Sequence, residues 1–172
     1  MSQPTEKKTK SERFVERTIE RCQQDNGLAA ALRRADNPDT EYQSWEFLAA
    51  FVDLDQVAQR LPYATIAAAI ARAKVGQNGS TRIGRALAQC YEDDNQSDQA
   101  KAKLRRLLAC ERGEEACRIL RPLFSLIDAK AGARLDYARL LNDLLFFNLD
   151  PQRTKSRWAM DFYRRAELEE TP

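Results

Sequence analysis

The chain has 172 residues, 43% of them hydrophobic, and a formal net charge of +2, which suits one generous domain or two small ones. It has no histidine and its four cysteines form no CxxC pair, so the usual zinc ligand sets are excluded. The start MSQPTEKKTK is too polar for a signal peptide, and the longest apolar run, LLNDLLFF, is too short to span a bilayer. We therefore expect a soluble, cytoplasmic protein with no membrane partner, no metal and no cofactor.

Helix-forming residues dominate the composition. The chain has 25 Ala and 19 Leu against 4 Val and 6 Ile, and this excess over β-branched residues predicts an all-α fold. It also has 20 Arg but only 8 Lys. Arginine suits phosphate groups, but a compositional bias of the source genome would produce the same excess. The positions of the arginines therefore have to decide between these interpretations.

The first half is predicted to hold short helices separated by polar turns. Residues 1–10 are expected to form a disordered tail, and Ser11 is the predicted N-cap of a helix that stops at DNG. A short helix LAAALRRA follows, and Thr40 is the predicted cap of an aromatic-rich segment. DLDQVAQRLP predicts a brief helix, after which Pro62 suits the first turn of an alanine-rich helix. The linker GQNGS then leads into a helix over 81–91.

The second half is predicted to hold a bundle of about four helices. Ser97 is the predicted cap of the first, and Pro122 inside the second predicts a kink or a break near Arg121. The four helices are expected over residues 98–111, 114–129, 136–148 and 152–169. We accordingly divide the chain into the tail, an N-terminal helical bundle over 11–91 and a C-terminal helical bundle over 92–172.

The basic excess lies in the second half of the chain. Residues 1–60 carry 9 basic and 11 acidic side chains, whereas residues 61–172 carry 19 and 15. Arg118 and Arg121 stand one turn apart, opposite the predicted apolar side of their helix. The segment PQRTKSRW places further cations at a helix start, where free amide groups also favour phosphate. Along the helix that starts at Asp98, Lys101, Arg105 and Arg112 line one flank at spacings of four and seven. Each of these three clusters alone is typical of a solvated helix face, but three clusters in one half favour a polyanion, provided that they converge in space.

Two residues have competing interpretations. Trp158 in the last cluster suits stacking on a base, but its helical spacing from Phe162 favours a core position. Gly84, in TRIGRAL, costs about 1 kcal/mol relative to alanine in a helix, which indicates a close approach of backbone. The approaching chain is expected to be the alanine-rich helix or a sugar-phosphate backbone, with Arg85 free to reach a phosphate.

The sequence predicts a protein that is not an enzyme. It has no GxxxxGK[ST] loop and no GxSxG elbow, and without histidine a general base would have to be a perturbed carboxylate, lysine or tyrosine. The acidic clusters DLD and EDD fall in predicted loops or caps without a second ligand set. We therefore do not expect metal-dependent nuclease chemistry.

Several segments, taken in order, resemble a known family. LAAALRRADNP, RIGRALAQ, KLRRLLACERGEEACRILRPLFSLI, LDYARLLNDLLFF and a late RW resemble CasB, the small subunit of the type I-E CRISPR Cascade complex, over about residues 28–163. The resemblance implies an all-helical, non-catalytic protein of two small bundles, present as two copies in a ribonucleoprotein. Its partners would be other Cascade subunits, the guide RNA, the target and non-target DNA strands, and a second copy of itself. Basic positions that coincide with the family pattern are Arg33, Arg34, Arg85, Lys103, Arg112, Arg121, Lys155 and Arg157.

The leading hypothesis is a subunit that binds nucleic acid through phosphate contacts without reading sequence, using the eight positions above and Arg118. The first alternative is a structural subunit whose arginines pair with acidic surfaces of partner proteins. A second alternative, a small regulator with a DNA-reading helix, fits less well because STRIGRALAQCYEDD turns acidic soon after its basic start.

Overall fold

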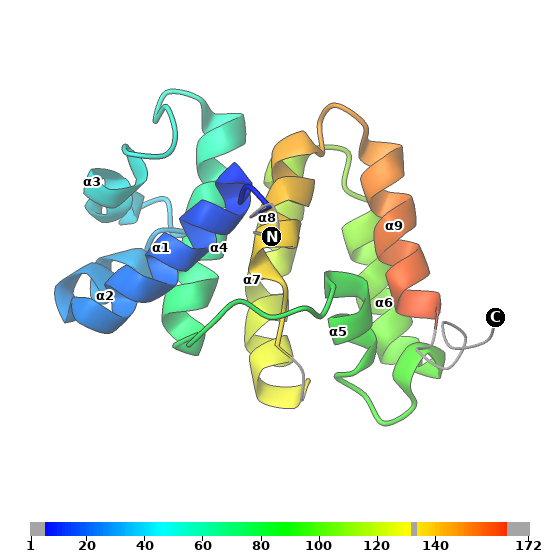
Figure 1. Cartoon of the computed structure of the whole chain (residues 1–172). Coiled ribbons are helices and arrows are strands. Elements are labelled where there is room, and N and C mark those ends of the chain that lie inside the picture. Colours follow the sequence, from blue (N-terminus) through cyan, green and yellow to red (C-terminus); the bar gives the residue numbers. More distant parts are fainter. Residues whose placement is uncertain (1–5, 132–133, 165–172) are drawn as a thin grey trace, which may run out of the picture.

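The computed structural model describes residues 6–131 and 134–164, and in these ranges the chain is built from helices (Figure 1). The predicted all-α class is confirmed, and the β-structure of the described residues is limited to one isolated bridge between Thr81 and Leu135. In chain order the elements are α1 (Lys10–Gln24), α2 (Asn26–Leu32), the 3₁₀ helix η1 (Glu41–Ser44), α3 (Trp45–Leu48), α4 (Val57–Ala73), α5 (Ile83–Ala88), the 3₁₀ helix η2 (Asp94–Gln96), α6 (Asp98–Leu108), α7 (Gly113–Lys130), α8 (Tyr137–Phe146) and α9 (Pro151–Tyr163).

The helices form two groups that share one core. Figure 1 shows α1 to α4 on one side, α5, α6 and α9 on the other, and α7 and α8 between them. The hydrophobic core is a continuous cluster that runs from Phe14 to Phe162, because α4 packs on α7 and α8 while α1 packs on α8. Helix α5 packs on α9, although the expected boundary assigns its residues to the first bundle. The division into two domains stays a prediction.

Helix α1 begins earlier than expected. Its N-cap is Thr9, whose hydroxyl accepts a hydrogen bond from the Glu12 backbone at 3.1 Å while the Glu12 carboxylate accepts one from the Thr9 backbone at 2.9 Å. This reciprocal pair satisfies two backbone donors, which a cap at Ser11 would not do. The prediction of Ser11 as the cap was wrong, and its side chain is buried within the helix. The predicted cap at Ser97 is confirmed by its bond from the Ala100 backbone at 3.2 Å.

Two prolines lie inside helices rather than at their ends. Pro62 was expected to start a helix, but α4 begins five residues earlier and carries buried side chains from Pro62 to Ala71. Pro122 was expected to kink or break its helix, and the predicted break was wrong because α7 is a continuous helix from Gly113 to Lys130. Each proline removes one hydrogen bond of its helix, and burial of the apolar side offsets that loss. The predicted side-chain cap at Thr40 was also wrong, because its hydroxyl donates to the Arg34 carbonyl oxygen at 3.0 Å.

Gly84 marks the contact between α5 and α9. A Cβ atom at this position would lie 2.8 Å from the backbone nitrogen of Phe162 and closer still to the carbonyl oxygen of Trp158. The expected close approach is therefore confirmed, but its partner is α9 and not the alanine-rich α4. Trp158 is 1% exposed and donates from Nε1 to Asp143 Oδ2 at 2.9 Å. It is a core residue, so stacking on a base is excluded in this fold.

Candidate nucleic-acid interface

The carboxylate of Asp36 connects α4 to α7. Its side chain is only 4% exposed, and it accepts from Arg72 Nη1 at 3.0 Å and from Arg72 Nη2. Arg121 Nε lies 3.5 Å from Asp36 Oδ2. Arg72 Nη1 also donates to the Arg33 carbonyl oxygen at 3.4 Å. Two arginines, one from α4 and one from α7, therefore share one negative charge, which leaves a local positive excess. Arg33, at the end of α2, lies beside α4, where its Nε donates to the Ala71 carbonyl oxygen at 3.4 Å.

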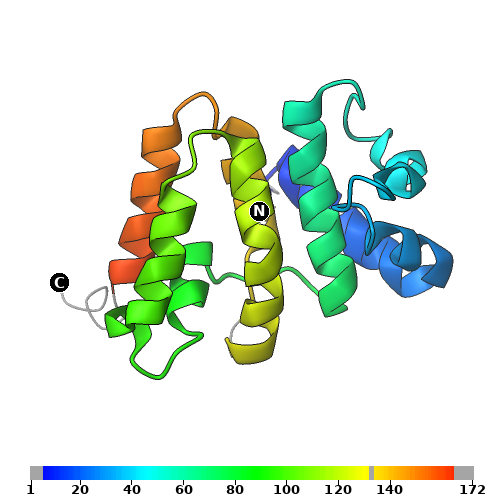
Figure 2. The same ribbon diagram turned by 180° about the vertical axis from the view of Figure 1, so that it is seen from behind.

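A pocket between α6 and α7 continues this positive region. Arg118 stands one turn before Arg121 on α7 and lines a pocket of about 370 Å³ together with Lys103 and Arg106 of α6. None of these three pocket cations forms an ion pair with another described residue. Figure 2 shows α4, α7 and α6 side by side. We call the resulting surface the basic band, which consists of Arg33, Arg72, Arg121, Arg118, Lys103 and Arg106.

Arg85 lies outside the basic band. Its guanidinium pairs with the Asp94 carboxylate and donates to the Arg164 carbonyl oxygen at 3.2 Å, and its side chain is 19% exposed. Asp94 has a φ of 52°, a left-handed conformation that costs energy for a residue other than glycine. The ion pair with Arg85 therefore stabilises the turn after α5 in which Asp94 has this conformation. A role for Arg85 in phosphate binding stays a prediction, and it would require this pair to open.

Three other predicted cations lie near the α6–α7 turn or on α9. Arg112 forms a two-contact pair with Glu114, with both nitrogen–oxygen distances 3.3 Å. Arg157 Nη1 lies 3.9 Å from Asp143 Oδ1. Lys155 forms no ion pair among the described residues and lies near Cys110, whose thiol pKa it lowers against the larger raising effect of burial. The structure therefore does not bring these residues together with the basic band into one cluster.

Arg34 is a predicted cation outside the basic band, and the band contains two arginines that the sequence analysis did not select. Arg34 is exposed and donates to Gln43 Oε1 at 3.4 Å. Arg72 and Arg106 were not selected, although Arg72 opens a stretch without acidic residues and Arg106 belongs to the RR pair of α6. The absence of acidic residues between positions 72 and 90 was the signal for Arg72. Which helix faces Arg72 was not readable from the sequence.

The sequence matches the family model of the CRISPR-associated protein Cse2 over residues 28–163. The chain belongs to the Cse2 family. The resemblance to CasB seen in the sequence is thereby confirmed, and every residue of the basic band lies within the matched region. No curated protein sequence matches the chain.

Solved structures of the Cse2 family share this fold. CasB from Thermus thermophilus is 25% identical with a TM-score of 0.69, and the match covers 89% of this chain and 97% of that one. CasB from M. ruber is also 25% identical with a TM-score of 0.74, covering 94% and 97%. A chain of a structure described as a CRISPR RNA-guided surveillance complex is 20% identical with a TM-score of 0.75, covering 93% and 95%, which shows likeness of fold.

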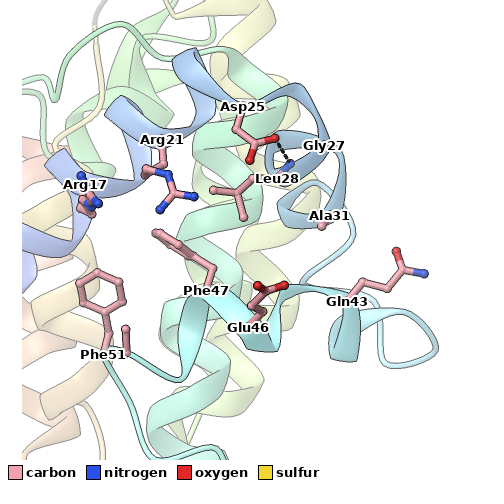
Figure 3. Close-up of a pocket in the computed structure, with 11 residues that line it drawn as sticks. Arg17, Arg21, Asp25, Gly27, Leu28, Ala31, Gln43, Glu46, Phe47 and Phe51 are labelled. Carbon is pink, nitrogen blue, oxygen red and sulfur yellow. Dashed lines mark hydrogen bonds between the residues drawn. The ribbon is translucent and has the colours of Figure 1, made fainter.

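A second pocket lies among the N-terminal helices of this Cse2-family chain. It has a volume of about 510 Å³ and is lined by residues of α1, α2 and α3 (Figure 3). Arg17 and Arg21 are accompanied there by Asp25 and Glu46, and the Asp25 carboxylate accepts a hydrogen bond from the Leu28 backbone at 3.0 Å. Because carboxylates repel phosphate, this pocket suits a polyanion less well than the pocket between α6 and α7.

The buried thiols and phenol are poor nucleophiles. Burial raises the pKa of Cys90 to about 11, that of Cys117 to about 12 and that of Tyr137 to about 12. These three groups therefore stay protonated at neutral pH. Within the described ranges, no three His, Cys, Asp or Glu side chains gather as a metal site would require. Nor is any helix of those ranges both long and apolar enough to cross a membrane.

Proposed function

We propose that this Cse2-family chain is a non-enzymatic, nucleic-acid-binding subunit of a Cascade surveillance complex. The observation that carries the proposal is the continuity of the basic band across three neighbouring helices, with Asp36 as the acidic group in its midst. Membership of the Cse2 family and likeness of fold to a chain of a CRISPR RNA-guided surveillance complex support it. The proposed partners are other Cascade subunits, the guide RNA, both DNA strands and a second copy of the chain.

The chemistry of the basic band fits binding without sequence readout. Arginine and lysine side chains that contact phosphates hold a strand in place but do not distinguish bases. Specificity would come from base pairing between guide and target, while the protein stabilises the opened duplex and the displaced strand. The band requires no catalytic group for this task.

The candidate residues differ in how freely they can reach a phosphate. Lys103 and Arg118 form no ion pair among the described residues, so we propose them as the principal contacts. Arg121 is about half exposed, and its contact with Asp36 at 3.5 Å is long enough to be exchanged for a phosphate. Arg33, a member of the band, and Arg34, Arg112, Lys155 and Arg157, which lie outside it, are proposed as further contacts because their side chains are exposed or partly exposed. We assign Arg85 last, because its pair with Asp94 must open first.

The salt dependence of single-strand binding tests the proposal. Arg118→Gln should weaken binding of the assembled complex to DNA and reduce the slope of log K against log salt by about 0.7, the value for one lost phosphate contact on a single strand. The matched control is Arg13→Gln on α1, which changes the net charge equally. Arg13 is exposed, lies outside the basic band and forms no ion pair with a described residue. It should leave both the affinity and the slope unchanged.

Asp36→Asn provides a test in the opposite direction. It removes the negative charge between Arg72 and Arg121 and keeps an oxygen that can accept from Arg72. We expect tighter binding and a steeper salt slope, because two arginines then face the strand without a competing carboxylate. If neither Arg118→Gln nor Asp36→Asn alters binding, the proposal fails. If Arg118→Gln instead abolishes assembly with partner proteins, the structural alternative is correct.

A further inference from the structure

The pocket between α6 and α7 has an apolar floor as well as a basic rim. Partly buried Tyr91, Ile119 and Leu126, which pack against the core, line it together with Leu123 and Pro122. Lys103, Arg106 and Arg118 complete the lining, and none of its described lining residues is acidic. A band that bound only phosphates would need no apolar hollow between its cations. The hollow therefore indicates a ligand that carries an apolar face and negative charges together.

A nucleotide in a single strand has this combination. Its base presents a flat π face, which aromatic and apolar side chains bind with little regard to base identity, and its phosphates suit the surrounding cations. A base within a duplex is stacked and paired, so it does not expose that face. An apolar partner helix would fill the floor but would also bury three unpaired cations, which costs energy unless it brings carboxylates to them.

The proline in α7 adds a polar feature beside this floor. Pro122 has no N–H, so it cannot donate to the Arg118 carbonyl oxygen the hydrogen bond of a regular helix. Arg118 and Pro122 both line the pocket. This carbonyl oxygen therefore lacks its regular helical donor, and an N–H group on the edge of any of the four bases, thymine N3–H included, can donate to it.

We propose that this pocket receives one unstacked base of a single strand while Lys103, Arg106 and Arg118 hold the adjoining phosphates. This inference rests on the proposed function and adds to it the kind of strand and the site of base insertion. It follows that the basic band prefers single-stranded to double-stranded nucleic acid and tolerates any base in the pocket.

The test compares an intact strand with one that lacks bases. The chain is titrated against a fluorescein-labelled oligothymidylate and against a strand of the same length in which every nucleotide is abasic, with anisotropy as the readout. Both strands carry the same phosphates. The wild-type chain should bind the intact strand about tenfold or more tightly than the abasic one, as expected for loss of base stacking.

Two tryptophan substitutions on α7 locate the effect. Leu126→Trp fills the pocket without changing charge, and Ser125→Trp adds the same side chain at an exposed neighbouring position that does not line it. Leu126→Trp should abolish the preference for the intact strand and Ser125→Trp should retain it, with circular dichroism confirming that both variants fold. Arg118→Gln should weaken binding to both strands.

The outcomes separate the two proposals. If the wild-type chain binds intact and abasic strands equally, base insertion is wrong and the proposed phosphate binding survives. If it binds neither strand, both proposals fail. If folded Leu126→Trp keeps the full preference, or loses a partner protein while strand binding is unchanged, the pocket does not receive a base. The comparison of strands on the wild-type chain needs no variant, so a failure of Leu126→Trp to fold does not remove the test.

Discussion

Replacing Gly84 by alanine should separate α5 from α9. The added Cβ would meet backbone atoms of Trp158 and Phe162, which cannot move aside as the end of a side chain can. Overpacking a core costs about 1–3 kcal/mol, and we take the upper end because both obstacles are main chain. Alanine recovers about 1 kcal/mol through its helix propensity. The expected net loss of unfolding free energy is about 2 kcal/mol, which lowers the melting temperature of a chain of this size by about 4–8 °C.

Thermal unfolding followed by far-UV circular dichroism measures this loss. The matched control is Gly76→Ala, because a Cβ at Gly76 meets nothing within 4 Å and none of the described glycines has a positive φ. Gly76→Ala should leave the melting temperature unchanged or raise it slightly, since alanine reduces the freedom of the unfolded chain. If Gly84→Ala melts at or above the wild-type temperature, the contact between α5 and α9 is not as close as described.

Three further predictions concern stability and reactivity. Burial raises the pKa of Asp143, so the folded state binds its proton more tightly than the unfolded state and stability contributed by this group is lost as pH rises above about 4. Asp143→Asn keeps an acceptor for Trp158 and removes the carboxylate that burial disfavours. The melting temperature of the variant minus that of the wild type should therefore increase from about pH 4 to about pH 7, and a decrease would contradict this. Thr9→Ala should cost about 1 kcal/mol in a denaturant titration, through loss of the cap of α1, and no loss would show that the cap contributes nothing. A thiol reagent should modify Cys22 before Cys117, which is buried, and mass spectrometry that found Cys117 labelled first in the native protein would refute its burial.

The local features of this chain were readable from its sequence. The excess of alanine and leucine gave the all-α class, and the bounds of α6 and α7 were predicted to within a few residues because apolar spacing, caps and breakers are local signals. The core position of Trp158 and the close approach at Gly84 were also readable, since each depends on a residue type at a definite place in a helix. Thr9 was missed in favour of Ser11, although Thr9 and Glu12 carry the T-x-x-E spacing of a capping box and Ser11 has no Glu or Gln three residues later.

The arrangement of charges was decided by the tertiary structure. A helical pattern shows which face of a helix is polar, but it does not show which other helix lies beside that face. Arg72 and Arg121 are 49 positions apart and meet at Asp36 only because α4 packs on α7. Arg85 appeared free in the sequence and is held by Asp94, because the turn after α5 brings the carboxylate back to it. The sequence by itself thus determined the helices and the number of positive charges, whereas packing selected the cations that join into a continuous surface.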